Sequence, residues 1–387
     1  MKHNYNWQEK RAKNAFLALE DGTVLYGYAV GAKVDKVGEV VFNTGLSGYQ
    51  EILSDPSYSG QFVTMTYPEI GNTGINEEDM ESRKFFLSGF IMHQMNEASN
   101  WRCDVSLQQR LVDEEVPAIA GIDTRALTVK LREVGTLKGF LHCSEEAISE
   151  EDAIKKAKAW CGLDGQDYAS KVTTPVIYTW DKDDSSVNTW GVLHGRELPK
   201  AEMNVVAYDF GVKWNILRNL RVSGMNVTVV PATTSASEVL AMKPDGIFFS
   251  NGPADPSAVS YAIQAGKELI GKVPIMGICL GHQLLSLASG AETFRLKFGH
   301  HGCNHPVKNL LTGKVEITSQ NHNFAVNLDS LPSCLEATHI NLNDNTVEGI
   351  KHKTEPMFAV QYHPEAAPGP HDPEYLFKQF ADMIKNA

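Results

Sequence analysis

Residues 273–283 contain a cysteine, Cys279, whose sequence surroundings predict nucleophilic chemistry. After a short apolar run, Gly277-Ile-Cys279-Leu-Gly281 matches the nucleophile-elbow pattern with cysteine in place of serine. We expect a strand, a sharp turn and then a helix that begins just behind the sulfur. The glycines let neighbouring backbone pass closely, and free N–H groups at the helix start favour a thiolate. The pattern favours Cys279 as a nucleophile, with a buried cysteine in a glycine-rich turn as the alternative.

A nucleophilic cysteine needs a base, and the base needs an orienting group. Gln361-Tyr-His-Pro-Glu365 offers both at the end of an apolar run. Pro364 disfavours the helical region for His363, so we expect an extended or turn-like segment. Side chains at i and i+2 of an extended segment point the same way, and Glu365 can therefore fix the imidazole of His363. Spacing alone leaves a plain surface turn equally open.

An acyl-transfer pathway also needs donors for an oxyanion. The backbone N–H of Leu280, directly after the cysteine, is one candidate. A second donor is expected from residues 250–256, where Gly252 allows close approach of the backbone. An ordinary Pro/Gly turn is the alternative for that segment.

The remaining histidines do not predict a metal site. His300-His-Gly-Cys-Asn-His305 lies on a short glycine-bearing segment without the ligand spacing of a closed zinc site. His282 follows the elbow on the expected helix and is assigned to packing or hydrogen bonding. We expect no metal in this chain.

Short apolar runs and helical patterns alternate from residue 203 to the end of the chain. This order predicts an α/β fold, Rossmann-like, with a parallel sheet covered by helices on both faces and functional groups at the carboxyl ends of its strands. The expected strands are residues 203–208, 227–230, 246–250, 273–278 and 356–361. The expected helices are residues 213–222, 235–242, 257–270, 280–288 and 374–384.

The first half of the chain predicts a separate domain of mixed α/β character. Strands are expected at residues 15–19, 24–29, 37–42 and 61–67, and helices at residues 124–133 and 150–159, the latter capped by Ser149. A polar, turn-rich stretch follows. We therefore expect an N-terminal domain over residues 1–190, a linker over 191–202 and a second domain over 203–387.

Length, composition and net charge limit the classes of protein to which this chain can belong. The chain has 387 residues, 42% of them hydrophobic, and a formal net charge of −12 that argues against nucleic acid and anionic membranes as partners. No signal peptide and no membrane-spanning segment is expected. The six cysteines include no C-x-x-C pair, which is typical of reduced thiols in a cytoplasmic protein.

The motifs together resemble a known family. Ser-Asn-Gly-Pro253, the cysteine elbow and Gln-Tyr-His-Pro-Glu365 are similar to triad (class I) glutamine amidotransferases. Beyond these, the chain resembles the small, glutamine-hydrolysing subunits of carbamoyl phosphate synthetases, and it does so over nearly all residues past Ala15. The motifs that carry this resemblance are Phe42-Asn-Thr-Gly-Leu-Ser-Gly-Tyr-Gln-Glu-Ile-Leu-Ser-Asp-Pro-Ser57, Thr66-Tyr-Pro-Glu-Ile-Gly-Asn72, Gly121-Ile-Asp-Thr-Arg-Ala-Leu127, Tyr208-Asp-Phe-Gly-Val-Lys-Trp-Asn215, Gly299-His-His-Gly302 and Ser319-Gln-Asn-His-Asn-Phe-Ala325.

The resemblance implies that Cys279 attacks the side-chain amide of L-glutamine, that His363 moves the protons and that Glu365 orients His363. Glutamine binding carries over to a set of residues in both expected domains, with Ser57 reaching in from the first. These residues are Ser57, Gly252, Ala254, Leu280, Gln283, Asn321, Asn323 and Phe324. Ala254, Cys303 and Asn323 stand where the family usually has a glycine or another small residue.

The resemblance also implies a partner, the large synthetase subunit, in a cytoplasmic heterodimer that supplies carbamoyl phosphate to arginine and pyrimidine synthesis. ATP and Mg²⁺ are expected on that subunit and no cofactor on this chain, which has neither G-x-x-x-x-G-K-[ST] nor G-x-G-x-x-G. Two alternatives stay open. One is the glutaminase component of another ATP-dependent amidotransferase, and the other is a catalytically silent regulatory subunit.

Overall fold

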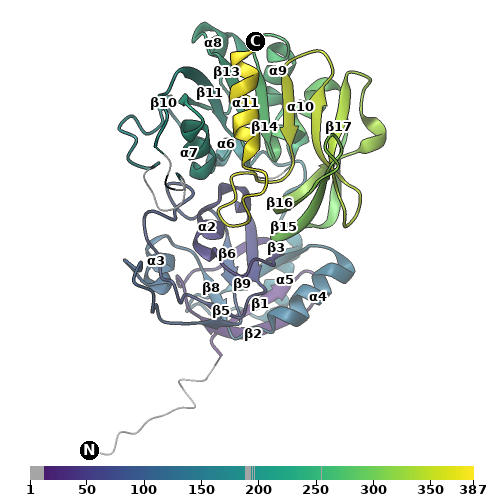
Figure 1. Ribbon diagram of the computed structural model, residues 1–387. Coiled ribbons are helices and arrows are strands. Elements are labelled where there is room, and N and C mark those ends of the chain that lie inside the picture. The colour runs from purple at the N-terminus through teal and green to yellow at the C-terminus, as the bar shows by residue number, and fades with distance from the viewer. Residues whose placement is uncertain (1–12, 188–192, 194, 196, 254) are drawn as a thin grey trace, which may run out of the picture. The chain divides into compact units, whose positions relative to one another are not determined.

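The structure is a computed structural model that describes residues 13–187, 193, 195, 197–253 and 255–387. The chain folds into two compact units (Figure 1). Unit 1 holds residues 13–46, 60–76 and 87–162, and unit 2 holds residues 47–59 and 77–86 together with the chain from residue 163 onward. No helix in the described ranges is long and apolar enough to span a bilayer.

Unit 1 is built around a closed β-barrel with the strand order β1-β2-β8-β6-β4-β3-β9. Phe62 is fully buried, and a Cβ at Gly38 or Gly89 would lie 3.1 or 2.8 Å from its ring. Glycine at these positions therefore makes room for the aromatic ring. The barrel strands are β1 (Ala15–Leu19), β2 (Val24–Ala29), β3 (Lys36–Asn43), β4 (Gln61–Met65), β6 (Gly89–Ile91), β8 (Ala118–Ala120) and β9 (Leu137–His142).

The strands expected in this part of the chain are confirmed, although β4 ends two residues earlier than predicted. The remaining elements of unit 1 are β5 (Glu69–Ile70), β7 (Gln94–Met95), α3 (Leu107–Asp113), α4 (Thr124–Val134) and α5 (Glu150–Ala159). Ser149 caps α5 as predicted, because its hydroxyl accepts a 3.1 Å hydrogen bond from the backbone N–H of Asp152. Ala153 and Ala157 bury the inner face of α5 against Phe16 and Phe140.

Unit 2 contains a ten-stranded sheet with the order β10-β12-β11-β13-β14-β19-β18-β16-β15-β17. The parallel half is formed by β12, β11, β13, β14 and β19, in which each neighbouring pair runs parallel. The predicted parallel sheet is confirmed for these strands. Their bounds are β11 (Met203–Asp209), β12 (Met225–Pro231), β13 (Gly246–Phe249), β14 (Ile275–Ile278) and β19 (Met357–Val360).

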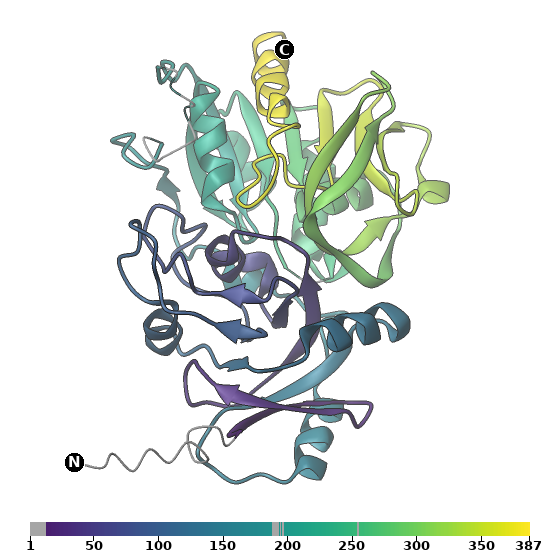
Figure 2. The same ribbon diagram turned by 60° about the horizontal axis from the view of Figure 1, so that its bottom comes forward.

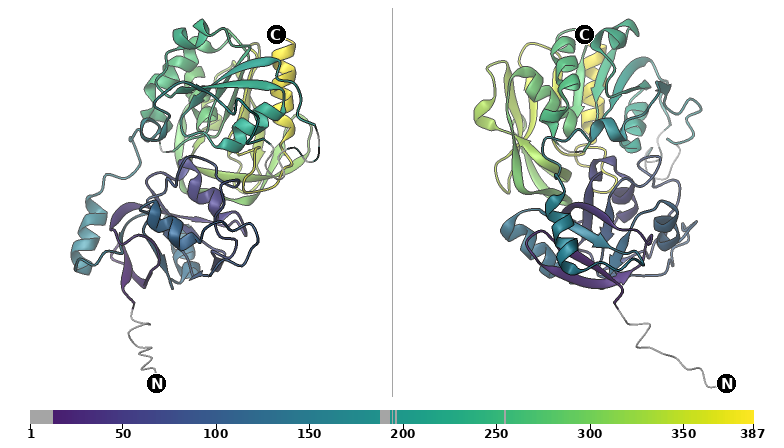
Figure 3. Two further views of the ribbon diagram at one scale, coloured as in Figure 1. Left: turned by 90° about the vertical axis from the view of Figure 1, so that its left-hand side faces the viewer. Right: turned by 180° about the vertical axis from the view of Figure 1, so that it is seen from behind.

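Helices cover both faces of the parallel half, as the apolar periodicity predicts (Figure 3). On one face α8, α9 and α10 pack over Tyr208, Ile247 and Phe249. On the other face α7 and α11 pack over Val205 and Phe248. The helices are α7 (Trp214–Val222), α8 (Ala236–Ala241), α9 (Ser260–Leu269), α10 (Leu280–Ser289) and α11 (Tyr375–Lys385), with the short 3-10 turn η2 (Pro256–Ala258) before α9.

The antiparallel half of the same sheet was not predicted. It consists of β18, β16, β15 and β17, and its long β15–β16 hairpin is the green ribbon of Figure 2. The bounds are β15 (Thr293–Asn309), β16 (Val315–Val326), β17 (Leu335–Asn341) and β18 (Val347–His352), with the 3-10 turn η3 (Leu328–Ser330) between β16 and β17. The sheet of unit 2 is therefore mixed.

The units also divide the chain differently from the expected domains. Residues 47–59 and 77–86 pack into unit 2, as do residues 163–187, all of which were expected in an N-terminal domain. They contribute α2 (Tyr49–Ser54), η1 (Pro56–Tyr58), α6 (Ala169–Val172) and β10 (Tyr178–Thr179) to unit 2. Much of the expected linker at 191–202 lies outside the described residues, because 191, 192, 194 and 196 are not among them.

Candidate active site

Cys279 occupies a strained turn between β14 and α10. Its φ of 53° and ψ of −105° lie in a region that side chains rarely adopt, at a cost of about 1–3 kcal/mol. The turn is tight because a Cβ at Gly281 would lie 2.1 Å from the carbonyl oxygen of Phe249, and one at Gly277 would lie 2.9 Å from the backbone of Gly281. The predicted nucleophile elbow is therefore present, with both glycines required by close backbone contacts.

His363 and Glu365 lie side by side, as their spacing predicted. Nδ1 of His363 is 2.6 Å from Oε1 of Glu365, and both side chains are buried. Burial alone would lower the pKa of His363, but the charge of Glu365 and the nearby sulfur of Cys279 raise it well above its usual value. Nε2 of His363 has no hydrogen-bonding partner among the described residues. This arrangement favours an imidazolium with one N–H facing Glu365 and the other available to a reacting group.

Lys213 binds the same oxygen of Glu365 that faces His363. It lies just before α7 and is buried, and its Nζ donates to Oε1 of Glu365 at 2.9 Å and to the carbonyl oxygen of Ala366 at 2.6 Å. Burial would raise the pKa of Glu365, but the charges of Lys213 and His363 lower it to about 2. Glu365 is therefore ionised throughout the neutral range, which keeps His363 oriented and charged.

A second buried carboxylate lies behind Lys213. Oε2 of Glu81 is 3.8 Å from Nζ of Lys213, and its Oε1 is 3.4 Å from Nη1 of Arg218. Burial raises the pKa of Glu81 to about 7 despite these two cations. Because Glu81 and Arg218 are themselves buried, the base of the site is a network of charges that depend on one another.

Ser57 lies in unit 2 with the cysteine rather than in the other unit. Its hydroxyl accepts a 2.9 Å hydrogen bond from Nδ2 of Asn251, in the segment after β13. Asp55 caps the turn that carries Ser57, since its Oδ1 accepts from the Ser57 backbone N–H at 2.9 Å. Asn251 also accepts from the backbone N–H of Lys213 at 3.1 Å. The predicted glutamine contact at Ser57 is thus tied to the segment that precedes the oxyanion candidate Gly252.

The predicted glutamine contacts on β16 lie next to the elbow. The Cys279 thiol donates to the backbone carbonyl oxygen of Asn321 at 3.5 Å. Nε2 of Gln283, on α10, donates to the carbonyl oxygen of Phe324 at 2.7 Å and to Oε1 of Gln361 at 2.9 Å. The structure therefore brings Gln283, Asn321 and Phe324 together beside Cys279.

The two expected oxyanion donors lie on neighbouring segments. Leu280 is the first residue of α10, so its N–H has no partner within the helix. Gly252 approaches Leu280 closely, because a Cβ at Gly252 would lie 2.8 Å from a methyl carbon of Leu280 and 2.3 Å from the carbonyl oxygen of Phe210. Ala254, also expected at the glutamine site, lies outside the described residues.

A cluster of histidines lies in the antiparallel half. One ligand atom each from His300, His322 and Glu348 lies within 4.8 Å of the others, a spacing that a metal ion could use. Hydrogen bonds already engage these groups. Nε2 of His300 is 2.8 Å from Asp344, Nδ1 of His322 is 2.7 Å from the carbonyl oxygen of Phe324, and Glu348 accepts from two side-chain amides. The donor set fits a hydrogen-bonded cluster, and the absence of a metal stays a prediction.

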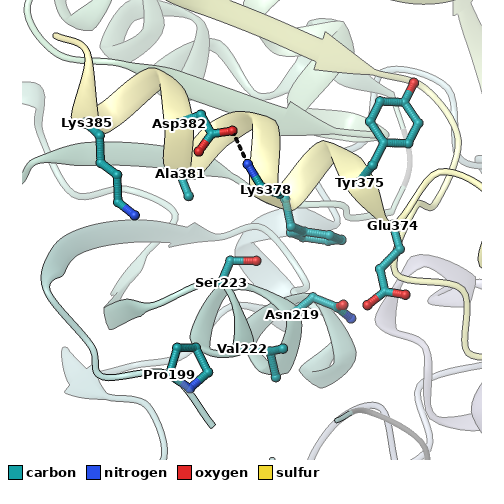
Figure 4. A pocket seen from close by; sticks show the side chains of 11 residues that line it. Pro199, Asn219, Val222, Ser223, Glu374, Tyr375, Lys378, Ala381, Asp382 and Lys385 are labelled. Carbon is teal, nitrogen blue, oxygen red and sulfur yellow. Dashed lines mark hydrogen bonds and ion pairs between the residues drawn. The ribbon is translucent and has the colours of Figure 1, made fainter. Parts of the chain in front are cut away.

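A pocket of about 530 Å³ lies elsewhere in unit 2, between α7 and α11 (Figure 4). Its walls include Asn219, Ser223, Tyr375 and the ion-paired Lys378 and Asp382. None of the residues predicted for catalysis or glutamine binding lines it. The reacting groups are thus separate from this surface pocket.

Several residues of the site were missed by the sequence analysis. Lys213, Asn251, Asp55 and Glu81 reach the triad or its neighbours only through tertiary contacts. A signal existed for Lys213 and Asn251, because each closely follows a strand of the parallel sheet, at the edge where functional groups gather. Asp55 and Glu81 had no comparable signal.

Comparisons with known proteins agree with this geometry. The family model described as glutamine amidotransferase class-I matches residues 206–383, and the model described as carbamoyl-phosphate synthase small chain, CPSase domain, matches residues 17–141. Three relatives named carbamoyl phosphate synthase small chain illustrate the likeness. The proteins from Rhodopirellula baltica and Akkermansia muciniphila are each 52% identical to this chain, over 381 and 371 residues, and in both cases 96% of this chain and 97% of the relative is covered. The chloroplastic protein of Oryza sativa subsp. japonica is 50% identical over 378 residues, which cover 97% of this chain and 83% of the relative.

Proposed function

The chain belongs to the carbamoyl phosphate synthase small chain family, and from that premise we propose that it is the glutamine-hydrolysing subunit of a carbamoyl phosphate synthetase. The observation that carries the proposal is the hydrogen-bonded series Lys213–Glu365–His363, next to a cysteine in a strained elbow. This is the arrangement that thioester chemistry on an amide requires.

In the first step, Sγ of Cys279 attacks the side-chain amide carbon of L-glutamine as a thiolate. The carbonyl oxygen gains the negative charge, which the N–H groups of Leu280 and the Gly252 segment stabilise. Nε2–H of His363 then gives its proton to the amide nitrogen. The carbon–nitrogen bond breaks, ammonia leaves and a γ-glutamyl thioester stays on Cys279.

In the second step, water attacks the thioester. Neutral His363 takes the proton from that water, the carbon–sulfur bond breaks, and glutamate leaves with the Cys279 thiolate restored. Glu365 stays ionised through both steps because Lys213 and His363 hold its pKa low. Its role is to fix the tautomer of His363 and to stabilise the charged imidazole.

Glutamine binding is assigned to Ser57, Gly252, Leu280, Gln283 and Asn321, together with Ala254, Asn323 and Phe324. The assignment is supported by the positions of Ser57 and Asn321, which are joined through Asp55. Gln283 also supports the assignment, since its amide nitrogen donates a hydrogen bond to the backbone carbonyl oxygen of Phe324.

The released ammonia is used by a second chain. We assign that partner as the large synthetase subunit, with ATP and Mg²⁺ bound there and no cofactor or metal bound here. Bicarbonate activated by ATP would accept the ammonia, and the product would serve arginine and pyrimidine synthesis. The complex is placed in the cytoplasm, and neither nucleic acid nor a membrane surface is a partner.

The test is glutamate release from L-glutamine by the purified chain, alone and with the large subunit. We expect slow hydrolysis by the chain alone and much faster hydrolysis in the complex when ATP and bicarbonate are present. If neither sample turns over glutamine while ammonia still supports synthesis, the chain is a silent structural subunit and the proposal is wrong.

A further inference from the structure

One buried histidine joins two of the assigned glutamine-binding residues. His301 lies on β15, directly across from Asn321 on β16. Its Nδ1 is 3.0 Å from Oδ1 of Asn321, and its Nε2 is 3.0 Å from Oδ1 of Asn323. Asn321 and Asn323 are two residues apart on one strand, so both face the same side as His301. The imidazole thereby bridges alternate residues of β16.

The hydrogen-bonding pattern fixes which nitrogen of His301 carries the proton. Nδ2 of Asn321 donates to Oδ2 of Asp55 at 2.8 Å, so the oxygen of the Asn321 amide must face Nδ1 and accept from it. Burial lowers the pKa of His301 to about 4, so the ring is neutral and Nε2 must accept. The Asn323 amide therefore presents its nitrogen to Nε2, an orientation reached by a half-turn about its last side-chain bond.

This polarity gives one directed chain of hydrogen bonds. It runs from the Asn323 amide to His301, from His301 to Asn321, and from Asn321 to the Asp55 carboxylate. Asp55 also accepts from the backbone N–H of Ser57, and Nδ2 of Asn251 lies 3.5 Å from it. All members of the chain are at least about nine-tenths buried, so each bond is shielded from water.

We propose that His301 is a positioning residue for glutamine binding, which locks Asn321 and Asn323 to each other and, through Asp55, to the turn that carries Ser57. The inference rests on the proposed glutaminase function and adds His301 to its working parts. Gly299 supports the arrangement, because a Cβ there would lie 2.4 Å from Nε2 of His301 and 2.4 Å from the Asn323 amide atom that faces it. The strand has a bulge at this point, which lets His301 approach Asn323.

The proposal separates binding from chemistry. Cys279, His363 and Glu365 are held by the elbow and by Lys213, whereas His301 bonds to the side chains of Asn321 and Asn323. Loosening His301 should therefore weaken glutamine binding and leave the chemical step largely intact, which raises KM with little change in kcat.

The experiment uses the complex of this chain with the large subunit and measures kcat and KM for glutamine. His301→Ala should raise KM by about tenfold or more, since both hydrogen bonds are lost. His301→Asn can still donate from the position of Nδ1 but cannot reach Asn323, and it should raise KM by about threefold. Asn323→Ala removes the same link from the other side and should match His301→Asn.

The decisive variant is His301→Asn combined with Asn323→Ala. Because each substitution breaks the same link, the double variant should be no worse than either single variant. Multiplied effects, or a fall in kcat at unchanged KM, would overturn the proposal. Asn323→Ala removes the link from the Asn323 side, so it tests the link even if His301→Ala does not fold.

A matched control is His142→Asn, which removes a histidine paired with Asp35 in unit 1. It should leave KM for glutamine unchanged. The unmodified complex distinguishes a failure of the proposed glutaminase function from a failure of the proposed role of His301. If it fails to hydrolyse glutamine, the proposed function is wrong, whereas normal wild-type turnover with an unaltered KM in His301→Ala contradicts only the role of His301.

Discussion

The two halves of the sheet in unit 2 solve different physical problems. The parallel half carries the reacting atoms, on a strained backbone at Cys279 and in a chain of buried charges from Lys213 to His363. The antiparallel half carries neutral, hydrogen-bonded side chains such as His301 and Asn321. Charge and strain thus act together where bonds change, and neutral hydrogen bonds hold Asn321, one of the proposed glutamine contacts.

This difference has a cost on each side. Buried charges stabilise one another only as a complete set. If one is removed, the others stay buried in a low dielectric without a compensating charge. Buried neutral histidines cost little free energy at neutral pH, but their protonation at lower pH is unfavourable because the charge would be buried. The two halves should therefore lose stability or activity under different perturbations.

The largest effect is expected for the reacting atom itself. Cys279→Ser should lower glutamine-dependent synthesis by at least about 10³-fold, because the hydroxyl is a far weaker nucleophile in this setting. Ammonia-dependent synthesis by the complex should be nearly unchanged. Both rates are measured on the same preparation, and retained glutamine-dependent activity would mean that another residue is the nucleophile.

Removal of one buried charge should come next. Lys213→Met removes one of the two cations beside Glu365 and should lower the free energy of unfolding by about 3 kcal/mol or more. It should also lower kcat about tenfold, since the His363–Glu365 pair loses the charge that sets its ionisation. Urea denaturation and glutaminase assays check both effects. Lys378→Met is the matched control, because its exposed ion pair with Asp382 should contribute less than about 1 kcal/mol. Equal losses in the two variants would contradict the buried network.

The antiparallel half should respond to pH. Burial lowers the pKa of His339 from 6.5 to about 4, so the unfolded chain binds a proton before the folded chain does. Stability is then full above pH 6.5 and falls as the pH is lowered to 4, by about 3 kcal/mol for this group. His339→Gln should flatten that part of the curve, measured by urea denaturation at several pH values. An unchanged slope between pH 6.5 and 4 would show that His339 is not buried in neutral form.

Charge in the parallel half should act at lower pH. The pKa of Glu365 is lowered to about 2 by Lys213 and His363, so its contribution is present above pH 4.5 and is lost as the pH falls toward 2. His339→Gln should leave this lower window unchanged, because His339 titrates between pH 6.5 and 4.

The smallest effect is expected at Cys303, in the antiparallel half. Its thiol lies 3.5 Å from the carbonyl oxygen of Pro368 and 3.8 Å from the hydroxyl of Ser319, which are weak contacts. Cys303→Ala should change stability by less than about 1 kcal/mol and KM for glutamine by less than about twofold. Thermal unfolding and steady-state kinetics check this, and a large rise in KM would assign Cys303 to the glutamine site.

The parallel half could be predicted because its signals are local. Strands such as Ile275–Ile278 are short apolar runs, and α10 begins directly behind Cys279. The side-by-side placement of His363 and Glu365 could be predicted from their two-residue spacing and from Pro364 between them. Parallel sheets also bring the carboxyl ends of their strands to one edge, which placed Cys279 and His363 at the same end of the sheet before any distance was known.

The antiparallel half could not be predicted in the same way. Its strands β15 and β16 bury polar residues, so they lack the alternation of apolar and polar side chains that identifies a strand. Their burial is compensated by partners far away in sequence, such as Asp55 for Asn321. The packing of residues 47–59 into unit 2 could not be predicted for the same reason. The hydrogen bond between the Asp55 carboxylate and the Asn321 amide joins residues far apart in sequence and leaves no periodic pattern.

The proposed mechanism requires a covalent γ-glutamyl intermediate at Cys279, which can be measured directly. The complex is mixed with glutamine, quenched in acid within the first turnovers, and analysed by intact-mass and fragment mass spectrometry. We predict a γ-glutamyl adduct that forms as ammonia is released, disappears on turnover and maps to Cys279 alone. Glutamate release without any adduct, or an adduct on another residue, would contradict the central claim.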